Sequence, residues 1–240
     1  MQVDLFIPCF VDQLFPQTAF NMVKVLEKAG CTVNYNPDQT CCGQPAFNAG
    51  FRDEAKNVCS KFLKDFSGTN YIVAPSASCV GFVKNYYMKM FENSSVHNDL
   101  KDLQKRIFEF SDFMVNVLQV EDLGAEFNAK ATYHDSCAAL RECKIKEEPR
   151  RLLSKVKGLQ LMEMEDVETC CGFGGSFAVK FEPISIGMAD QKVINAKNTG
   201  AECIISTDMS CLMHLDGYIK NKGINLEVFH IADVLAAGLK

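Results

Sequence analysis

Cysteines are the residues of this chain whose spacing most clearly suggests chemistry. The run TCCG occurs twice, half a chain apart, at 40–43 and at 169–172. Neighbouring Cα atoms lie about 3.8 Å apart, whereas an unstrained disulfide needs about 4.4–6.8 Å. An adjacent pair is therefore poorly suited to a disulfide and well suited to a metal centre that takes two thiolates. The glycine after each pair allows close approach of the backbone or a positive φ.

Single cysteines surround each pair in the same order. Each half offers four candidate thiolate ligands, which are Cys9, Cys41, Cys42 and Cys79 in the first half and Cys137, Cys170, Cys171 and Cys211 in the second. Four thiolates without a matching carboxylate are the usual ligands of an iron–sulfur cluster, and zinc also accepts them. We therefore predict up to one cluster in each half, a [4Fe-4S] cluster by its ligand set, with zinc as the alternative metal.

The elements that must position these cysteines also repeat. Short apolar strands alternate with helices of 3.6-residue periodicity, and strands are predicted at 3–8, 31–35, 71–75, 131–134, 159–162 and 203–206. Such alternation favours an α/β fold of two tandem Rossmann-like parallel-sheet units related by internal repeat. We expect one unit at 1–120 and the other at 128–240, each with its own core, joined by the polar stretch 119–130.

Parallel strands would bring the cysteines of each half together. All strands of a parallel sheet end at the same edge, and ligands bind in the loops that leave that edge. In each half, the first cysteine, the pair and the last cysteine follow three successive predicted strands. Ser76 and Asp208 stand three residues before Cys79 and Cys211, where a helix N-cap would place each cysteine in the first helical turn and favour its thiolate.

Several stretches together resemble one known family. They are PCFVDQLFPQTAFNMVKVLEKAG, QTCCGQPAFNAG, APSASCVGFV, YHDSCAALRE, TCCGFGGSFAVKF and STDMSCLMH, and they span nearly the whole chain. They resemble the cysteine-rich CCG domain, which occurs twice in one of the chains of heterodisulfide reductase and in the iron–sulfur subunits of glycolate and glycerol-3-phosphate oxidases. The resemblance is strongest to the short, two-copy iron–sulfur subunits of lactate utilisation.

The resemblance implies an iron–sulfur electron-transfer subunit of a complex that oxidises L-lactate to pyruvate, inactive on lactate without its partner subunits. It implies a ferredoxin-type iron–sulfur subunit and a further subunit as partners, because this chain contains no ferredoxin-type C-x2-C-x2-C-x3-C run. Two alternatives stay open. One is a thiol–disulfide redox subunit like heterodisulfide reductase, and the other is a structural zinc-binding module.

The chain departs from the family pattern at one position in each half. CCG domains that bind the non-cubane form of [4Fe-4S] cluster commonly end in C-x-x-C, and here Ser76 and Asp208 replace the first of these cysteines. Each half therefore has four candidate thiolates instead of five. A cubane cluster in either half is the alternative.

The remaining cysteines and one histidine have simpler interpretations. Cys59 lies on the apolar stripe of a predicted helix, Cys203 lies inside a strand, and Cys31 follows a glycine, so we expect all three to be structural. Cys143, soon after Cys137, is an open candidate for the second site. His134 forms H-x-x-C with Cys137, and we interpret it as a hydrogen-bonded neighbour of the site rather than a ligand.

Composition excludes several classes of function. The net charge is -5 and no basic block occurs, which argues against nucleic acid and against a polybasic membrane anchor. No uncharged apolar stretch approaches the ~18 residues of a transmembrane helix, so we expect no transmembrane segment. The start, MQVDLFIPCF, has no pattern of a secretory signal. Together with twelve cysteines in a chain of this length, this predicts a reducing, cytoplasmic location.

Overall fold

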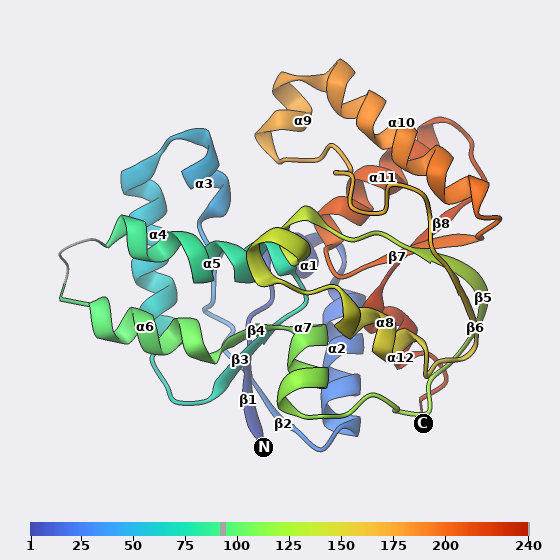
Figure 1. Cartoon of the computed structure of the whole chain (residues 1–240). Coiled ribbons are helices and arrows are strands. Elements are labelled where there is room, and N and C mark those ends of the chain that lie inside the picture. Colours follow the sequence, from blue (N-terminus) through green and yellow to red (C-terminus); the bar gives the residue numbers. More distant parts are fainter. Residues whose placement is uncertain (92–94, 240) are drawn as a thin grey trace.

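Two four-stranded parallel sheets form the framework of the protein (Figure 1). The computed structural model describes residues 1–91 and 95–239. The first sheet has the order β2-β1-β3-β4, and its strands are β1 (Gln2–Leu5), β2 (Thr32–Tyr35), β3 (Tyr71–Ala74) and β4 (Ile107–Glu109). The second has the order β6-β5-β7-β8, and its strands are β5 (Glu126–Tyr133), β6 (Lys157–Met162), β7 (Cys203–Ser206) and β8 (Glu227–His230). The predicted α/β fold of two similar units is confirmed.

Helices connect the strands in both halves. The first half contains α1 (Cys9–Leu14), α2 (Pro16–Lys28), α3 (Gln44–Ala49), α4 (Arg52–Asp65), α5 (Ala77–Met90), α6 (His97–Arg106) and α7 (Phe110–Asp112). The second contains α8 (Glu147–Leu153), α9 (Ser176–Lys180), α10 (Glu182–Asn198), α11 (Met209–Asn221) and α12 (Ile231–Ala236). Single π-helical turns occupy Phe113–Val117 and Ala139–Cys143. Within residues 1–91 and 95–239, no helix has both the length and the apolar character that crossing a bilayer requires.

The fourth strand of each sheet was not predicted from the sequence. β4 and β8 run directly into α7 and α12, so neither leaves an isolated run of alternating residues for a periodicity argument to find. The predicted joint 119–130 is also partly wrong, because β5 already begins at Glu126. The first residues of β5 alternate between exposed and half-buried positions, which made this part of the strand resemble a polar linker.

The internal repeat extends to single hydrogen bonds. Leu5 pairs with Val73 in the first sheet as Tyr133 pairs with Ile205 in the second. The next residue along each strand donates its backbone N–H to the same partner, from Phe6 to the Val73 carbonyl at 3.0 Å and from His134 to the Ile205 carbonyl at 2.8 Å. Phe6 and His134 therefore occupy equivalent positions in the two halves.

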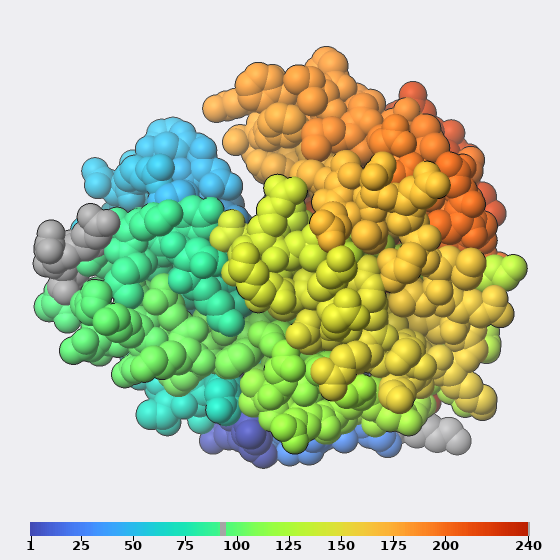
Figure 2. All heavy atoms as spheres, viewed as in Figure 1, coloured from blue at the N-terminus to red at the C-terminus, as the bar shows by residue number. Residues whose placement is uncertain are grey.

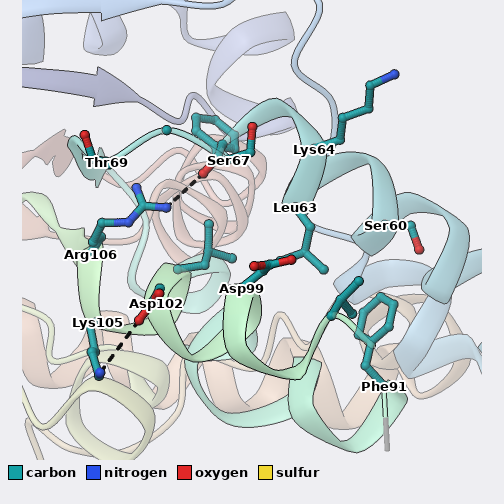
Figure 3. Close-up of a pocket in the computed structure, with 14 residues that line it drawn as sticks. Ser60, Leu63, Lys64, Ser67, Thr69, Phe91, Asp99, Asp102, Lys105 and Arg106 are labelled. Carbon is teal, nitrogen blue, oxygen red and sulfur yellow. Dashed lines mark hydrogen bonds and ion pairs between the residues drawn. The ribbon is translucent and has the colours of Figure 1, made fainter. Parts of the chain in front are cut away.

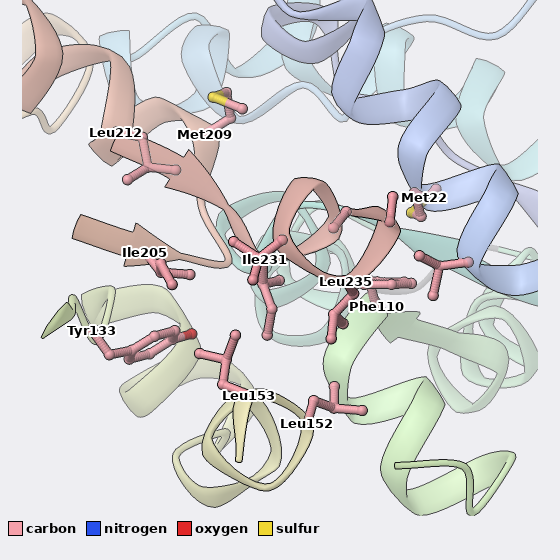
Figure 4. Packing of buried hydrophobic residues seen from close by; sticks show 14 of the residues in the cluster. Met22, Phe110, Tyr133, Leu152, Leu153, Ile205, Met209, Leu212, Ile231 and Leu235 are labelled. Carbon is pink, nitrogen blue, oxygen red and sulfur yellow. The ribbon is translucent and has the colours of Figure 1, made fainter. Parts of the chain in front are cut away.

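The largest hydrophobic cluster belongs to both halves. Alternate residues of a strand point to opposite faces of its sheet. Val3 and Leu5 point into a cluster that also contains residues of β5, β7, α11 and α12, whereas Phe6 and Ile72 point to a second cluster with α4 and α5. Figure 4 shows Met22 of the first half beside Leu235 of the second. The expectation of a separate core in each half is therefore wrong.

Polar contacts also join the halves. Asp233 of α12 accepts hydrogen bonds from Thr18 and Asn21 of α2, at 3.1 and 2.8 Å. Lys24, also of α2, donates its ammonium group to the Leu239 carbonyl at 2.7 Å. The division of the chain at 1–120 and 128–240 stays a prediction, and the two sheets fold around one shared interior.

Candidate metal centres

The four candidate cysteines of the first half follow three neighbouring strands of one sheet. Cys9 is the first residue of α1, directly after β1. Cys41 and Cys42 lie in the loop between β2 and α3, and Cys79 lies in the first turn of α5, after β3. Because β2, β1 and β3 are adjacent and parallel, their carboxyl ends bring these loops to one edge.

The thiols of the first half form a chain of contacts. The Sγ atoms of Cys9 and Cys41 are 3.9 Å apart. Cys41 contacts Cys42, and Cys42 contacts Cys79. The predicted convergence of these four cysteines is confirmed as geometry, and their role as ligands stays a proposal.

The second half repeats the arrangement. Cys137 opens a short helical turn after β5, Cys170 and Cys171 lie in the loop after β6, and Cys211 lies in the first turn of α11. The thiol contacts run from Cys137 to Cys170, from Cys170 to Cys171 and from Cys171 to Cys211. The two halves thus place equivalent thiols in equivalent order.

The glycine after each cysteine pair has the conformation that the sequence predicted. Gly43 has a φ of 91° and Gly172 a φ of 94°, a region that residues with a Cβ rarely adopt. Each donates its N–H to the first cysteine of its pair, at 3.4 Å from the Sγ of Cys41 or Cys170. At Gly172 a Cβ would lie 2.6 Å from the carbonyl oxygen of Ser185, so only glycine fits.

Hydrogen bonds to the first cysteine of each pair favour its thiolate. The thiols of Cys42 and Cys9, with the Gly43 N–H, lower the pKa of Cys41 to about 3. Contacts with the Cys137 and Cys171 thiols lower the pKa of Cys170 to about 2. The pKa values of the Cys9, Cys42, Cys137 and Cys171 thiols are raised, because each donates a hydrogen bond to that thiolate and is partly or fully buried. Each group of cysteines therefore concentrates negative charge at one sulfur, which favours a bound cation.

Buried side chains donate hydrogen bonds to the backbone at each cysteine pair. Tyr87 donates its hydroxyl to the Cys42 carbonyl at 2.7 Å, and the Cys59 thiol donates to the same oxygen at 3.5 Å. In the second half Ser185 donates its hydroxyl to the Gly172 carbonyl at 2.8 Å. Tyr87 and Ser185 were not predicted as positioning residues, because a tyrosine or serine on a helix carries no signal of a partner so distant in sequence.

Residues beside the two sites are in contact where the halves join. Ser76 and Asp208 are the N-cap residues of α5 and α11 as predicted, and they form an antiparallel bridge with each other. Neither side chain caps its own helix. Instead, Asp208 accepts a 2.9 Å hydrogen bond from the backbone N–H of Ser78 in α5. Nearby, the rings of Phe10 and Phe173 are in edge contact, with their centroids 5.8 Å apart.

His134 lies against the second site. A ring nitrogen of His134 and the Sγ atoms of Cys171 and Cys211 all lie within 4.8 Å of one another. The side chain is 0% exposed, and neither ring nitrogen has a hydrogen-bond partner among the residues described. Burial, with a smaller contribution from Lys192, lowers the pKa of His134 to about 3, so the ring is neutral. The interpretation of this side chain as a hydrogen-bonded neighbour is therefore wrong.

The other cysteines lie outside the two thiol groups. Cys31, Cys59 and Cys203 are buried in the core, as predicted. Cys143 donates its thiol to the carbonyl oxygen of Ala77, at 3.4 Å, in the first turn of α5. That contact ties the π-helical turn of the second half to a helix of the first and gives Cys143 a structural role.

A surface cavity of about 600 Å³ between α4 and α6 has no connection with the cysteines (Figure 3). No cysteine lines it. Two of its cations are already engaged, since Lys105 pairs with Asp102 and Arg106 donates to the backbone carbonyls of Phe66 and Asn70. This cavity therefore suggests no chemistry related to the two sites.

The helices that follow the two cysteine pairs lie near each other at the surface. Figure 2 shows the surface indented between the segment of α3, in blue, and that of α9, in orange. Apolar side chains are exposed along this region of the chain, with Phe51 at 60%, Val179 at 83% and Phe181 at 52% exposure. A rim of this composition is typical of surfaces that contact other proteins.

Sequence comparison identifies a family and full-length relatives. The model of the cysteine-rich domain, CCG, matches residues 3–84 and 131–216. Lactate utilization protein A 2 of Bacillus cereus (strain 03BB102) is 42% identical over 240 residues, which is 100% of this chain and 99% of that protein. Lactate utilization protein A of Halalkalibacterium halodurans is 42% identical over 235 residues, covering 98% of this chain and 96% of that protein.

Structural comparison supports the fold alone. A hypothetical protein from Helicobacter pylori, known from its crystal structure, superposes with a TM-score of 0.63 at 13% sequence identity. The match covers 100% of this chain and 49% of that protein. The arrangement of two similar α/β units therefore also occurs within a longer protein.

Proposed function

This chain belongs to the cysteine-rich CCG domain family, and we propose that it is the iron–sulfur electron-transfer subunit of a complex that oxidises L-lactate to pyruvate. One observation carries the proposal. The similarity to lactate utilization protein A extends over the full chain, so the aligned region spans both groups of converging thiols. The proposed role is that of an oxidoreductase subunit, which needs its partners to act on lactate.

The donor atoms fit an iron–sulfur cluster. Each group offers four sulfur atoms, one of them a thiolate, and a glycine N–H directed at that thiolate. The proposed ligands are Cys9, Cys41, Cys42 and Cys79 for one cluster and Cys137, Cys170, Cys171 and Cys211 for the other. A [4Fe-4S] cluster held in this way supplies a carrier for single electrons.

The side chains give each site a buried and an accessible side. Cys42 and Cys171 are almost fully buried, whereas Cys9, Cys41 and Cys170 are half-buried. The buried thiols hold the centre in a medium of low dielectric, and the half-exposed thiols bring it near the surface, where a partner can approach. The exposed apolar rim beside α3 and α9 supports such an approach.

The proposal leaves the chemistry of lactate to other subunits. Oxidation of L-lactate to pyruvate releases two electrons and two protons. The proposed partners are a ferredoxin-type iron–sulfur subunit and a further subunit, which take the electrons from lactate or pass them on. We place the complex in the cytoplasm, because many cysteines in a chain long enough to fold without disulfides suggest metal binding in a reducing compartment.

Anaerobic co-purification with the products of neighbouring genes tests the proposal. Addition of L-lactate to the complex should reduce the clusters, seen as a change in the EPR spectrum, and D-lactate serves as the matched control. Iron and acid-labile sulfide are measured on the same sample. Zinc at about two per chain without sulfide would support the structural zinc module instead. A response to disulfide substrates but not to lactate would support the heterodisulfide-reductase-like alternative.

A further inference from the structure

The two sites differ at one position that the internal repeat makes equivalent. Phe6 follows β1 and His134 follows β5, and both donate their backbone N–H to the neighbouring strand in the same register. We propose that the imidazole of His134 is an additional metal ligand, so that the second centre is bound by nitrogen and sulfur and the first by sulfur alone. This proposal rests on the assignment of a metal centre to the second group of cysteines.

Distance and burial carry the proposal. A ring nitrogen of His134 and the Sγ atoms of Cys171 and Cys211 all lie within 4.8 Å of one another. Zinc binds nitrogen at about 2.0–2.1 Å and sulfur at about 2.3 Å, so a nitrogen and a sulfur on one metal lie at most about 4.4 Å apart, and a small side-chain adjustment brings the three atoms onto one metal. The His134 side chain is 0% exposed, and both of its nitrogens lack a partner among the described residues. A buried polar group without a partner costs free energy, which a bound metal removes.

Three charged side chains around the second site are already engaged. Asp135 forms a two-point ion pair with Arg150, at 2.9 and 2.8 Å. The buried Lys192 donates to the backbone carbonyls of Asp166 and Val167. Asp208 accepts from Ser78 and Ser210. The Sγ atoms of Cys171 and Cys211 lie within 4.8 Å of a ring nitrogen of His134 and can share a metal atom with it.

The first half shows what the same position does without a metal role. Phe6 packs edge-on against Phe62, with the ring centroids 4.7 Å apart, inside a hydrophobic cluster that also contains Cys42. The fold therefore accommodates at this position an aromatic ring that needs no hydrogen-bond partner. His134→Phe consequently makes the second half like the first and removes the nitrogen donor with a planar ring retained.

Pulsed EPR of the anaerobically reconstituted chain tests the proposal. Wild-type chain is prepared with ¹⁴N-histidine and with ¹⁵N-histidine, and the coupling of a directly bound nitrogen should change with the label. That coupling should persist in His214→Gln and in Cys42→Ser, and should disappear in His134→Phe. Absence of any nitrogen coupling in the labelled wild type, or its survival in His134→Phe, would overturn the proposal. Absence of the coupling in the wild type is decisive even if a variant fails to fold.

A second metal separates this proposal from the proposed function. Metal-free chain is titrated with Co²⁺ alone, and the same histidine labels are read by pulsed EPR. Nitrogen bound to Co²⁺ in a chain that never assembles an iron–sulfur cluster would support the His134 ligand and contradict the electron-transfer role. Intact clusters with no histidine coupling to iron or Co²⁺ would support the electron-transfer role and contradict the His134 ligand. Retention of iron together with loss of the coupling in His134→Phe would support both proposals.

Discussion

Asp208 of the second half accepts a 2.9 Å hydrogen bond from the backbone N–H of Ser78, in the first turn of a helix of the first half. The N–H groups at a helix start have no partner within the helix, and a carboxylate there also interacts favourably with the helix dipole. The helix that carries Cys79 is therefore capped by a residue from the other half of the chain. The first site thus depends in part on the second half.

Asp208→Ala should destabilise the protein by about 1–2 kcal/mol, because it removes the acceptor at the start of α5. Chemical denaturation in urea, followed by circular dichroism, measures the change. Asp216→Ala is the matched control on α11, where the aspartate forms an exposed ion pair with Lys220 at 2.6 Å. Such pairs contribute about 0–1 kcal/mol. A loss in Asp208→Ala no greater than that of the control would contradict the capping role.

Tyr87→Phe should loosen the first cysteine pair without disturbing the second. The variant removes the 2.7 Å hydrogen bond to the Cys42 carbonyl and should cost about 1–2 kcal/mol, since the oxygen keeps only the weak Cys59 donor. Tyr86→Phe is the control, because the Tyr86 hydroxyl binds the Glu142 carboxylate instead. Alkylation mass spectrometry of the metal-free chain should show faster labelling of Cys42 in Tyr87→Phe alone. Equal rates in both variants would exclude this role.

Gly172→Ala should be far more disruptive than Gly30→Ala, although both glycines have positive φ. A Cβ at Gly30 meets nothing within 4 Å, whereas at Gly172 it would lie 2.6 Å from a backbone oxygen. The shared conformational penalty is about 1–2 kcal/mol, and the overlap adds about 1–3 kcal/mol at Gly172 only. Thermal unfolding of the two variants measures the difference. Similar losses would mean that the loop relaxes freely around the second pair.

Glu109→Gln should change how stability depends on pH. Burial raises the pKa of the Glu109 carboxyl from 4.5 to about 8, although hydrogen bonds from Ser111 and Asp112 oppose the shift. The native protein therefore holds a proton that the unfolded chain releases, so the stabilisation is full below about pH 4.5 and is lost as pH rises through about 8. From pH 5 to 8, wild type should lose on the order of 3 kcal/mol relative to Glu109→Gln.

The unfolding free energy of both proteins, measured in urea at several pH values, checks this prediction. Glutamine keeps a carbonyl oxygen that can accept from the start of α7, so the cap itself is preserved. A constant difference between the two proteins across this range would show that Glu109 titrates normally.

The sequence was sufficient to predict three of the four strands of each sheet and the convergence of the cysteines. Strand-exit positions follow from periodicity, and a parallel sheet brings the exits to one edge whatever the side chains are. The role of Asp208 was only half predictable. Its place three residues before Cys211 gives the N-cap position, but the carboxylate caps the opposite helix, and that choice depends on how the halves pack.

The surroundings of the sites were less predictable. In the sequence His134 is a polar residue at a strand end, and only the packed structure shows that both ring nitrogens lack a partner among the described residues. Its equivalence to Phe6 could have been found by aligning the two strands residue by residue, since both stand three residues before a cysteine of the repeat. The shared core could not be predicted for the same reason. In the sequence, an apolar residue such as Met22 indicates burial but not which residues it packs against.

Iron per chain after anaerobic reconstitution tests the central claim, one four-thiolate centre in each half. Cys42→Ser and Cys171→Ser should each lose about half of the iron, because each removes one ligand of a single centre. Cys59→Ser should keep all of it, since a serine hydroxyl can still donate to the Cys42 carbonyl. Circular dichroism confirms that each variant is folded. Complete loss of iron in a folded Cys42→Ser or Cys171→Ser variant, or equal loss in Cys59→Ser, would contradict the account.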